Sequence, residues 1–173
     1  MSPDVVPLPG TTGLIALMAC PGRERTLLTH AGVPGQGLRA ELEALASWGA
    51  RGMLTLMEQG ELDALGLADM GEQARAAGLR WWHMPITDFC APDSRFEAAW
   101  RRDGPAILDE LAQGQHLAIH CLAGLGRTGT VAARILVDWG EPPEAAIQRV
   151  RQARPGTIQS EEQLKYITAL RAG

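Results

Sequence analysis

Short apolar runs alternate with segments of helical periodicity along most of the chain, and this alternation constrains the fold most strongly. The runs Leu14–Ala19, Gly52–Met57, Arg80–Ile86 and Leu117–Cys121 have the length and composition of buried strands. Helical patterns lie between and after them. Strands that alternate with helices predict an α/β fold, with a mostly parallel central sheet of about four to five strands flanked by helices.

Seven segments are expected to be helical, wholly or in part. They are Leu38–Trp48, Glu61–Ala77 (with Gly66 and Gly71 as weak points), Ser94–Trp100, Pro105–Gln113, Arg127–Trp139, Pro142–Arg151 and Ser160–Leu170. A break is expected around Asp103–Gly104. The Pro-rich residues 1–12 are predicted to be a flexible arm on a single domain, 1–173.

Charge and cysteine usage exclude several classes of protein. The formal net charge is −4 and the Lys and Arg residues are scattered, so a nucleic-acid partner is not expected. The longest apolar stretch, Leu14–Cys20, is too short to span a bilayer, and the first residues do not read as a signal peptide. Three cysteines (Cys20, Cys90, Cys121) without metal-ligand spacing fit a reducing cytoplasm, no membrane association, and no metal or other cofactor.

The segment from His120 to Gly129 leaves the fourth strand, passes through a loop with two glycines and enters a helix. Gly124 and Gly126 can adopt positive φ, which lets consecutive backbone N–H groups turn inward as an anion-binding nest. The positive end of the following helix adds to this field. A phosphate is therefore expected to bind the loop residues, which are Leu122, Ala123, Gly124, Leu125, Gly126 and Arg127.

The same loop contains the residues of a nucleophilic mechanism. Cys121 points at the nest, which should favour the thiolate, and thiolates attack phosphorus to give a phosphocysteine. The planar fork of Arg127 can bind two phosphate oxygens at once. Thr128 could donate its hydroxyl to the departing sulfur, and His120 is expected to support the loop. A buried structural cysteine before a Gly-rich turn would not require Arg and Thr in this register.

A general acid must protonate the leaving group, and two carboxylates follow the third strand. Asp93 precedes Ser94, which forms a capping-box pattern with Glu97, so Asp93 has a structural duty available at a helix start. Asp88 stands free at the strand end and is the favoured acid. Phe89, beside it, either flanks the entering substrate or pins the loop to the core.

His120–Gly129 matches the His-Cys-x5-Arg-Ser/Thr motif of the protein-tyrosine-phosphatase superfamily, two-thirds along the chain as in dual-specificity phosphatases. The chain most resembles the kinase-associated (cyclin-dependent kinase inhibitor 3-like) branch, through pieces at Ala19–Gly22, Gly60–Leu62, Pro85–Asp88 and Thr157–Gln159 with Gln163. This resemblance implies hydrolysis of phosphoproteins through a phosphocysteine, with Asp88 in the acid loop. It also implies that a glutamine orients the attacking water. Gln159 and Gln163 both remain candidates, since Ser160 and Gln163 form a capping box.

The loop side chains Leu122, Ala123 and Leu125 are uncharged, which disfavours inositol phospholipids, for which family members usually place lysines there. Phosphotyrosine, with phosphoserine and phosphothreonine as further candidates, is the expected substrate class. The resemblance suggests, without establishing, a kinase partner. Two alternatives stay open: a phosphopeptide-binding pseudo-phosphatase, and a thiol enzyme such as an arsenate reductase or sulfurtransferase. A reductase would need Cys90 or Cys20 as its resolving thiol.

Overall fold

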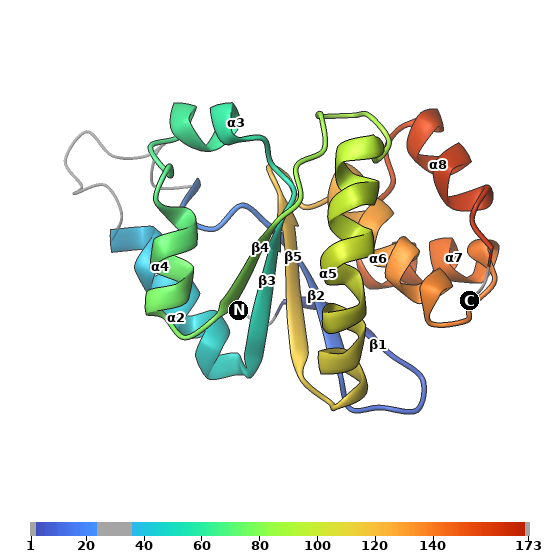
Figure 1. Ribbon diagram of the computed structural model, residues 1–173, viewed down its shortest axis with the longest axis horizontal. Coiled ribbons are helices and arrows are strands. Elements are labelled where there is room, and N and C mark those ends of the chain that lie inside the picture. The colour runs from blue at the N-terminus through green and yellow to red at the C-terminus, as the bar shows by residue number, and fades with distance from the viewer. Residues whose placement is uncertain (1–2, 24–35, 172–173) are drawn as a thin grey trace.

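The computed structural model describes residues 3–23 and 36–171, and within them five strands form one sheet in the order β1-β2-β5-β3-β4 (Figure 1). The strands are β1 (Asp4–Pro7), β2 (Leu14–Ala19), β3 (Ala50–Thr55), β4 (Arg80–His83) and β5 (His116–Cys121). Strands β2, β5, β3 and β4 run parallel, and β1 is antiparallel to β2. The predicted α/β fold with a mostly parallel sheet is confirmed.

Helices cover both faces of the sheet (Figure 1). Helices α2 (Gln36–Trp48) and α4 (Met70–Ala76) pack on one face. Helices α5 (Ser94–Ala112) and α6 (Gly126–Asp138) pack on the other, where α7 (Pro143–Ala153) and α8 (Glu161–Thr168) contact α6. The short helix α3 (Gln59–Ala64) follows β3 at the carboxyl edge of the sheet.

The prediction of a flexible arm over residues 1–12 is wrong for the part that forms β1. Residues Asp4 to Pro7 pair in register with β2, from Asp4 opposite Leu17 to Pro7 opposite Leu14. Val6 and Leu8 are buried, so this segment contributes apolar surface to the core. Proline is tolerated here because β1 is an edge strand, where a missing N–H leaves no ladder bond unmade.

The break expected around Asp103–Gly104 does not occur, and α5 is continuous through Pro105. Its buried residues keep helical spacing across the proline: Phe96, Trp100, Gly104, Ile107 and Leu111. Gly104 lies directly against the ring of Trp100, where a side chain would not fit. Burial of this continuous stripe outweighs the hydrogen bond lost at Pro105.

The segment 61–77 divides into α3 and α4, and only one of its two glycines marks the division. Gly66 has a φ of 69° and ends the turn after α3. Gly71 instead lies inside α4, because the ring of Trp81 packs against it and a Cβ there would be 2.5 Å from the ring. The sequence predicts a weak point of the helix at Gly71, but in the structure this glycine allows α4 to pack closely against β4.

Candidate active site

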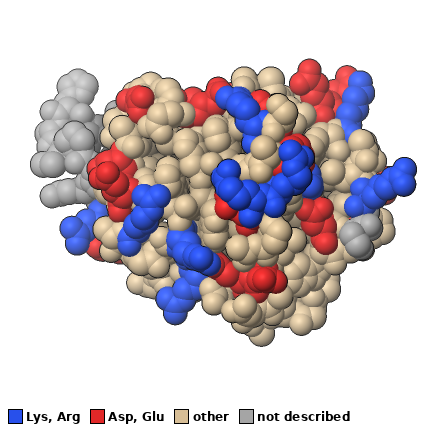
Figure 2. Space-filling model, in the orientation of Figure 1, with Lys and Arg blue, Asp and Glu red and all other residues tan. Residues whose placement is uncertain are grey.

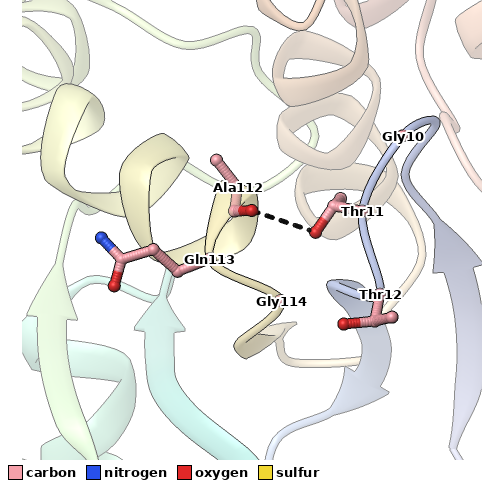
Figure 3. A pocket seen from close by; sticks show the side chains of 6 residues that line it. All are labelled: Gly10, Thr11, Thr12, Ala112, Gln113 and Gly114. Atoms are coloured by element: carbon pink, nitrogen blue, oxygen red, sulfur yellow. Dashed lines mark hydrogen bonds between the residues drawn. The ribbon is translucent and has the colours of Figure 1, made fainter.

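The hollow drawn in Figure 3 is not where the candidate site lies. It is lined by Gly10–Thr12, from the turn between β1 and β2, and by Ala112–Gly114, at the end of α5. The Thr11 hydroxyl donates to the carbonyls of Leu111 (2.8 Å) and Ala112 (3.3 Å), which caps that helix end. These segments precede β2 and β5, so the hollow is at the opposite edge of the sheet from the loop after β5.

The loop after β5 joins the carboxyl end of that strand to the first turn of α6, as the sequence predicts. Gly124 has a φ of 72°, and a Cβ there would be 2.3 Å from the backbone oxygen of Met18. Only glycine satisfies both the conformation and the close approach to β2. Cys121 is buried, 3% exposed, at the start of this loop.

Carbonyl groups of the loop accept hydrogen bonds from backbone N–H groups that lie outside the loop. The Leu122 oxygen accepts from Cys20 N (3.2 Å), and the Leu125 oxygen accepts from Ile158 N (3.2 Å). The N–H groups of residues 122–125 have no backbone acceptor within the described part of the chain. In a trans peptide the C=O of one residue and the N–H of the next point in opposite directions, so the outward carbonyls of Leu122 and Leu125 turn the N–H groups of Ala123 and Gly126 to the inner side of the loop. An inward set of N–H donors is a binding site for an oxyanion.

His120 supports the loop through a buried chain of hydrogen bonds. Its Nδ1 lies 3.4 Å from the Cys121 carbonyl, which can only accept, and its Nε2 lies 2.8 Å from the Thr55 hydroxyl. Nδ1 therefore carries the proton and Nε2 accepts from Thr55, which itself accepts from Trp81 Nε1 (2.8 Å). Burial lowers the pKa of His120 to about 4, so the ring is neutral at physiological pH.

Arg127 is held by three residues from two parts of the chain. Its Nη1 and Nη2 donate to the two oxygens of Glu61 (2.7 and 2.9 Å), and Nη1 also donates to the Ile86 carbonyl (3.0 Å). Nη2 is 3.1 Å from Asp88 Oδ1. Nε has no hydrogen-bond partner among residues 3–23 and 36–171. The side chain is fully buried, so the guanidinium is rigidly oriented by these contacts.

Glu61 is the site residue that the sequence analysis did not assign a role. It lies at the third position of α3, where it also accepts from Glu58 N (2.8 Å) in a capping box. Burial would raise the pKa of Glu61, but the hydrogen bonds from Arg127 and from Glu58 N, together with the charge of Arg127, hold that pKa below its ordinary value. The only sequence signal was Gly60–Leu62, which carries part of the family resemblance.

The two candidate acids have different environments. Asp93 accepts from Arg95 N (3.0 Å) and Phe96 N (3.2 Å) as the N-cap of α5, and its carboxylate pairs with the Arg95 side chain. Asp88 is half exposed and lies beside Arg127. Its neighbour Phe89 has a φ of 58°, an uncommon conformation for a non-glycine residue. This arrangement favours Asp88 as the mobile acid, which stays a prediction.

The two glutamines are also distinguished by their contacts. Gln163 is buried, its Oε1 accepts from Gln159 N and Ser160 N, and its Nε2 donates to the Cys90 carbonyl (3.2 Å). Gln159 is exposed, and its Oε1 lies against Gly126, where a Cβ would be 2.8 Å away. No side-chain hydrogen bond of Gln159 is found in the described segments. Gln159 is thus the better candidate for orienting water.

The remaining predicted residue is Thr128, in the first turn of α6. Its hydroxyl is buried and has no hydrogen-bond partner within the part of the chain described. The two further cysteines, Cys20 and Cys90, are both free. Burial raises the pKa of the Cys20 thiol to about 12, so it is protonated at neutral pH.

On the face that Figure 2 draws, charges of one sign are not concentrated in a single patch. Figure 2 shows Lys and Arg side chains interleaved with Asp and Glu side chains on the face it draws. Across residues 3–23 and 36–171, no group of three His, Cys, Asp or Glu side chains could hold a metal ion. In the same ranges, every helix is too short or too polar to cross a membrane.

The profile of the family described as "Polymorphic toxin system, DSP-PTPase phosphatase" matches residues 31–141. The chain belongs to the DSP-PTPase phosphatases. A crystal structure of kinase associated phosphatase, with its catalytic-site cysteine replaced by serine, superposes with a TM-score of 0.74 at 27% identity. The superposition covers 89% of this chain and 83% of that one. The resemblance found in the sequence is confirmed.

The sequence is also similar to that of two curated phosphatase relatives, and in each case the similarity covers only part of the relative's length. Rat Cyclin-dependent kinase inhibitor 3 is 29% identical over 143 residues, or 79% of this chain and 64% of that protein. Human Protein tyrosine phosphatase type IVA 3 is 38% identical over 87 residues, or 50% of this chain and 49% of that protein. The chain thus matches less than two thirds of either relative.

Protonation of His120 should couple stability to pH. The folded pKa of about 4 lies below the ordinary value of 6.5, so the stabilisation is complete above pH 6.5 and is lost as pH falls toward 4. The loss should be on the order of 3 kcal/mol. Urea unfolding at pH 7 and pH 4.5 should show it in the wild type, and His120→Asn should lack that part of the pH dependence. Identical dependence in both proteins would contradict the assignment.

Removal of the Glu61 charge should weaken anion binding, although Glu61 acts only through Arg127 and is not proposed to contact the anion. In Glu61→Gln the guanidinium of Arg127 loses its paired acceptor, and the affinity for inorganic phosphate should fall by about 10-fold or more. Calorimetric titration with phosphate measures this. Glu58→Gln is the matched control, because Glu58 also lies at the start of α3 but pairs with Arg95. Equal losses in the two variants would argue against a specific role for Glu61.

Proposed function

We propose that this chain is a metal-independent phosphatase that hydrolyses phosphate monoesters of proteins through a phosphocysteine on Cys121. The observation that carries the proposal is the loop after β5, with its N–H donors inward, Cys121 at its start and the Arg127 guanidinium fixed by Glu61. An aryl or alkyl phosphate binds with its oxygens on these donors. Family membership supports this chemistry, and the partial match to the relatives makes it a proposal.

The first step is displacement at phosphorus. The Cys121 thiolate attacks, a P–S bond forms, and the P–O bond to the leaving group breaks while Asp88 gives its proton to the departing oxygen. Arg127 binds the equatorial oxygens through Nε, which has no partner in the described residues, and Nη2, whose contact to Asp88 is exchanged for the phosphate. This exchange frees the Asp88 carboxyl to act at the leaving group.

The second step is hydrolysis. The Asp88 carboxylate takes a proton from water, the water oxygen attacks phosphorus, and the P–S bond breaks to return the thiolate. Gln159 orients this water, since the amide of Gln163 is occupied by the α8 cap and by Cys90. Thr128 donates its hydroxyl to the departing sulfur, and a reducing compartment such as the cytoplasm would keep Cys121 active.

Phosphotyrosine on a protein is the substrate class we propose, with phosphoserine and phosphothreonine as weaker substrates. The two large apolar side chains that are exposed in the described residues, Phe89 (59%) and Leu122 (36%), belong to the acid loop and the phosphate loop. Both suit an aromatic leaving group. The names of the rat relative and of the solved kinase associated phosphatase suggest a protein kinase as a candidate partner.

The competing thiol-enzyme hypothesis has less support. An arsenate reductase needs a second thiol to resolve its intermediate, and of the two candidates Cys20 is a poor nucleophile because burial raises its pKa, which leaves only the free Cys90. A binding-only pseudo-phosphatase would not need the acid, thiol and unpartnered Thr128 hydroxyl together.

The test is hydrolysis of para-nitrophenyl phosphate and phenyl phosphate with reductant and EDTA. The wild type should turn over both substrates in EDTA. Asp88→Asn should slow phenyl phosphate, the poorer leaving group, by about 100-fold and para-nitrophenyl phosphate much less. Asp93→Asn is the matched control and should stay near wild type, because asparagine also caps helices.

Three outcomes would contradict the proposal. Loss of turnover in EDTA would indicate a metal enzyme. Phosphopeptide binding by the wild type without turnover would favour the pseudo-phosphatase. A selective loss of activity toward phenyl phosphate in Asp93→Asn, rather than in Asp88→Asn, would identify Asp93 as the general acid.

A further inference from the structure

Arg154, at the C-terminal end of α7, contacts the outer side of the phosphate loop with two of its three guanidinium nitrogens. Its Nε donates to the Gly124 carbonyl (2.8 Å) and its Nη2 donates to the Ala123 carbonyl (3.2 Å). Its Nη1 pairs with Asp4 Oδ2 in β1 (2.6 Å). One side chain therefore links two consecutive peptide groups of the loop to the first strand of the sheet.

These two contacts determine which way two loop amides point. Because C=O and N–H of a trans peptide are opposed, a carbonyl of residue 123 or 124 held outward turns the N–H of the next residue inward. The N–H groups concerned are those of Gly124 and Leu125, which have no backbone acceptor in the described ranges. The flanking carbonyls of Leu122 and Leu125 have other donors. Arg154 thus orients the two peptide groups in the middle of the loop.

The middle of the loop is also where the backbone needs such a restraint. Gly124 has positive φ, and glycine peptides reorient at little steric cost. If the two carbonyls lost their donor, they could turn inward and place negative partial charge where the phosphate oxygens bind. The planar, bidentate fork of arginine restrains two adjacent peptides at once, and lysine would reach only one.

We propose that Arg154, held by Asp4, is a positioning residue that orients two amide donors for the transferring phosphoryl group. This inference rests on the proposed function of the same loop. It makes β1 part of the active-site apparatus through the contact of Asp4 with Arg154. The amides stabilise charge that grows on the equatorial oxygens, so their orientation affects the rate more than ground-state binding.

The experiment compares Arg154→Met, Arg154→Lys and Asp4→Asn with a control on the same helix. Arg149 also links α7 to β1, through the Pro7 carbonyl and Glu141, but has no contact to the loop among the described residues. Arg149→Met therefore removes a comparable tie to β1 and leaves the loop carbonyls bound. The readouts are kcat and KM for para-nitrophenyl phosphate, inhibition by vanadate, affinity for inorganic phosphate, and melting temperature.

Arg154→Met should lower kcat by about 10- to 100-fold and weaken vanadate inhibition in proportion, with a smaller change in KM. Arg154→Lys should recover part of this loss, and Asp4→Asn should show a smaller loss of the same kind. Arg149→Met should stay within about 2-fold of wild type in kcat even where its melting temperature falls, since the loop restraint is intact.

Two results would overturn the inference. One is wild-type kcat and vanadate inhibition in Arg154→Met, and the other is an equal loss in Arg149→Met. Asp4→Asn keeps the test decisive if Arg154→Met does not fold, because Asp4 is on the surface edge strand. If the wild type itself has no turnover, the proposed function fails. The inference is then judged separately, by whether Arg154→Met binds inorganic phosphate more weakly than Arg149→Met.

Discussion

The charge of Arg127 is carried by a side chain with no exposed surface, and the arrangement of the site depends on neutralising it. A buried guanidinium without partners would be strongly destabilising. Its partners are Glu61 at the start of α3, and Ile86 and Asp88 in the segment after β4. The pairing brings α3 and the acid loop onto the phosphate loop through contacts within the protein itself, so these contacts preorganise the site.

A second constraint is the polarity of the loop backbone. The peptide carbonyls in the tight turn need hydrogen-bond donors. Donors outside the loop bind them: Cys20 N, the Arg154 guanidinium and Ile158 N. Satisfying the carbonyls on the outer side leaves the N–H groups facing inward. The anion site is therefore a consequence of how β2, α7 and the segment before α8 pack around the loop. His120, which is neutral and buried, adds to this support by donating to the carbonyl of the nucleophile Cys121.

Local patterns predicted the elements that depend on local chemistry. The alternation of strands and helices, the strand-loop-helix passage at Cys121 and the Ser160–Gln163 capping box are all present. Contacts between distant positions could not be predicted in this way. Glu61 meets Arg127 across 66 positions and Asp4 meets Arg154 across 150. The sequence of β1 alone predicts a flexible arm for the same reason, because the strand is stabilised by pairing with β2 rather than by local features of its sequence.

The central claim is that Cys121 forms a covalent bond to phosphorus. The most direct measurement is rapid mixing with para-nitrophenyl phosphate, acid quenching, and mass spectrometry of the peptides that carry the three cysteines. The account predicts one phosphoryl group on the Cys121 peptide, none on the Cys20 or Cys90 peptides, and none in Cys121→Ser. Turnover by the wild type with no phosphoryl group on Cys121 at any time point, or with the group on another residue, would contradict it.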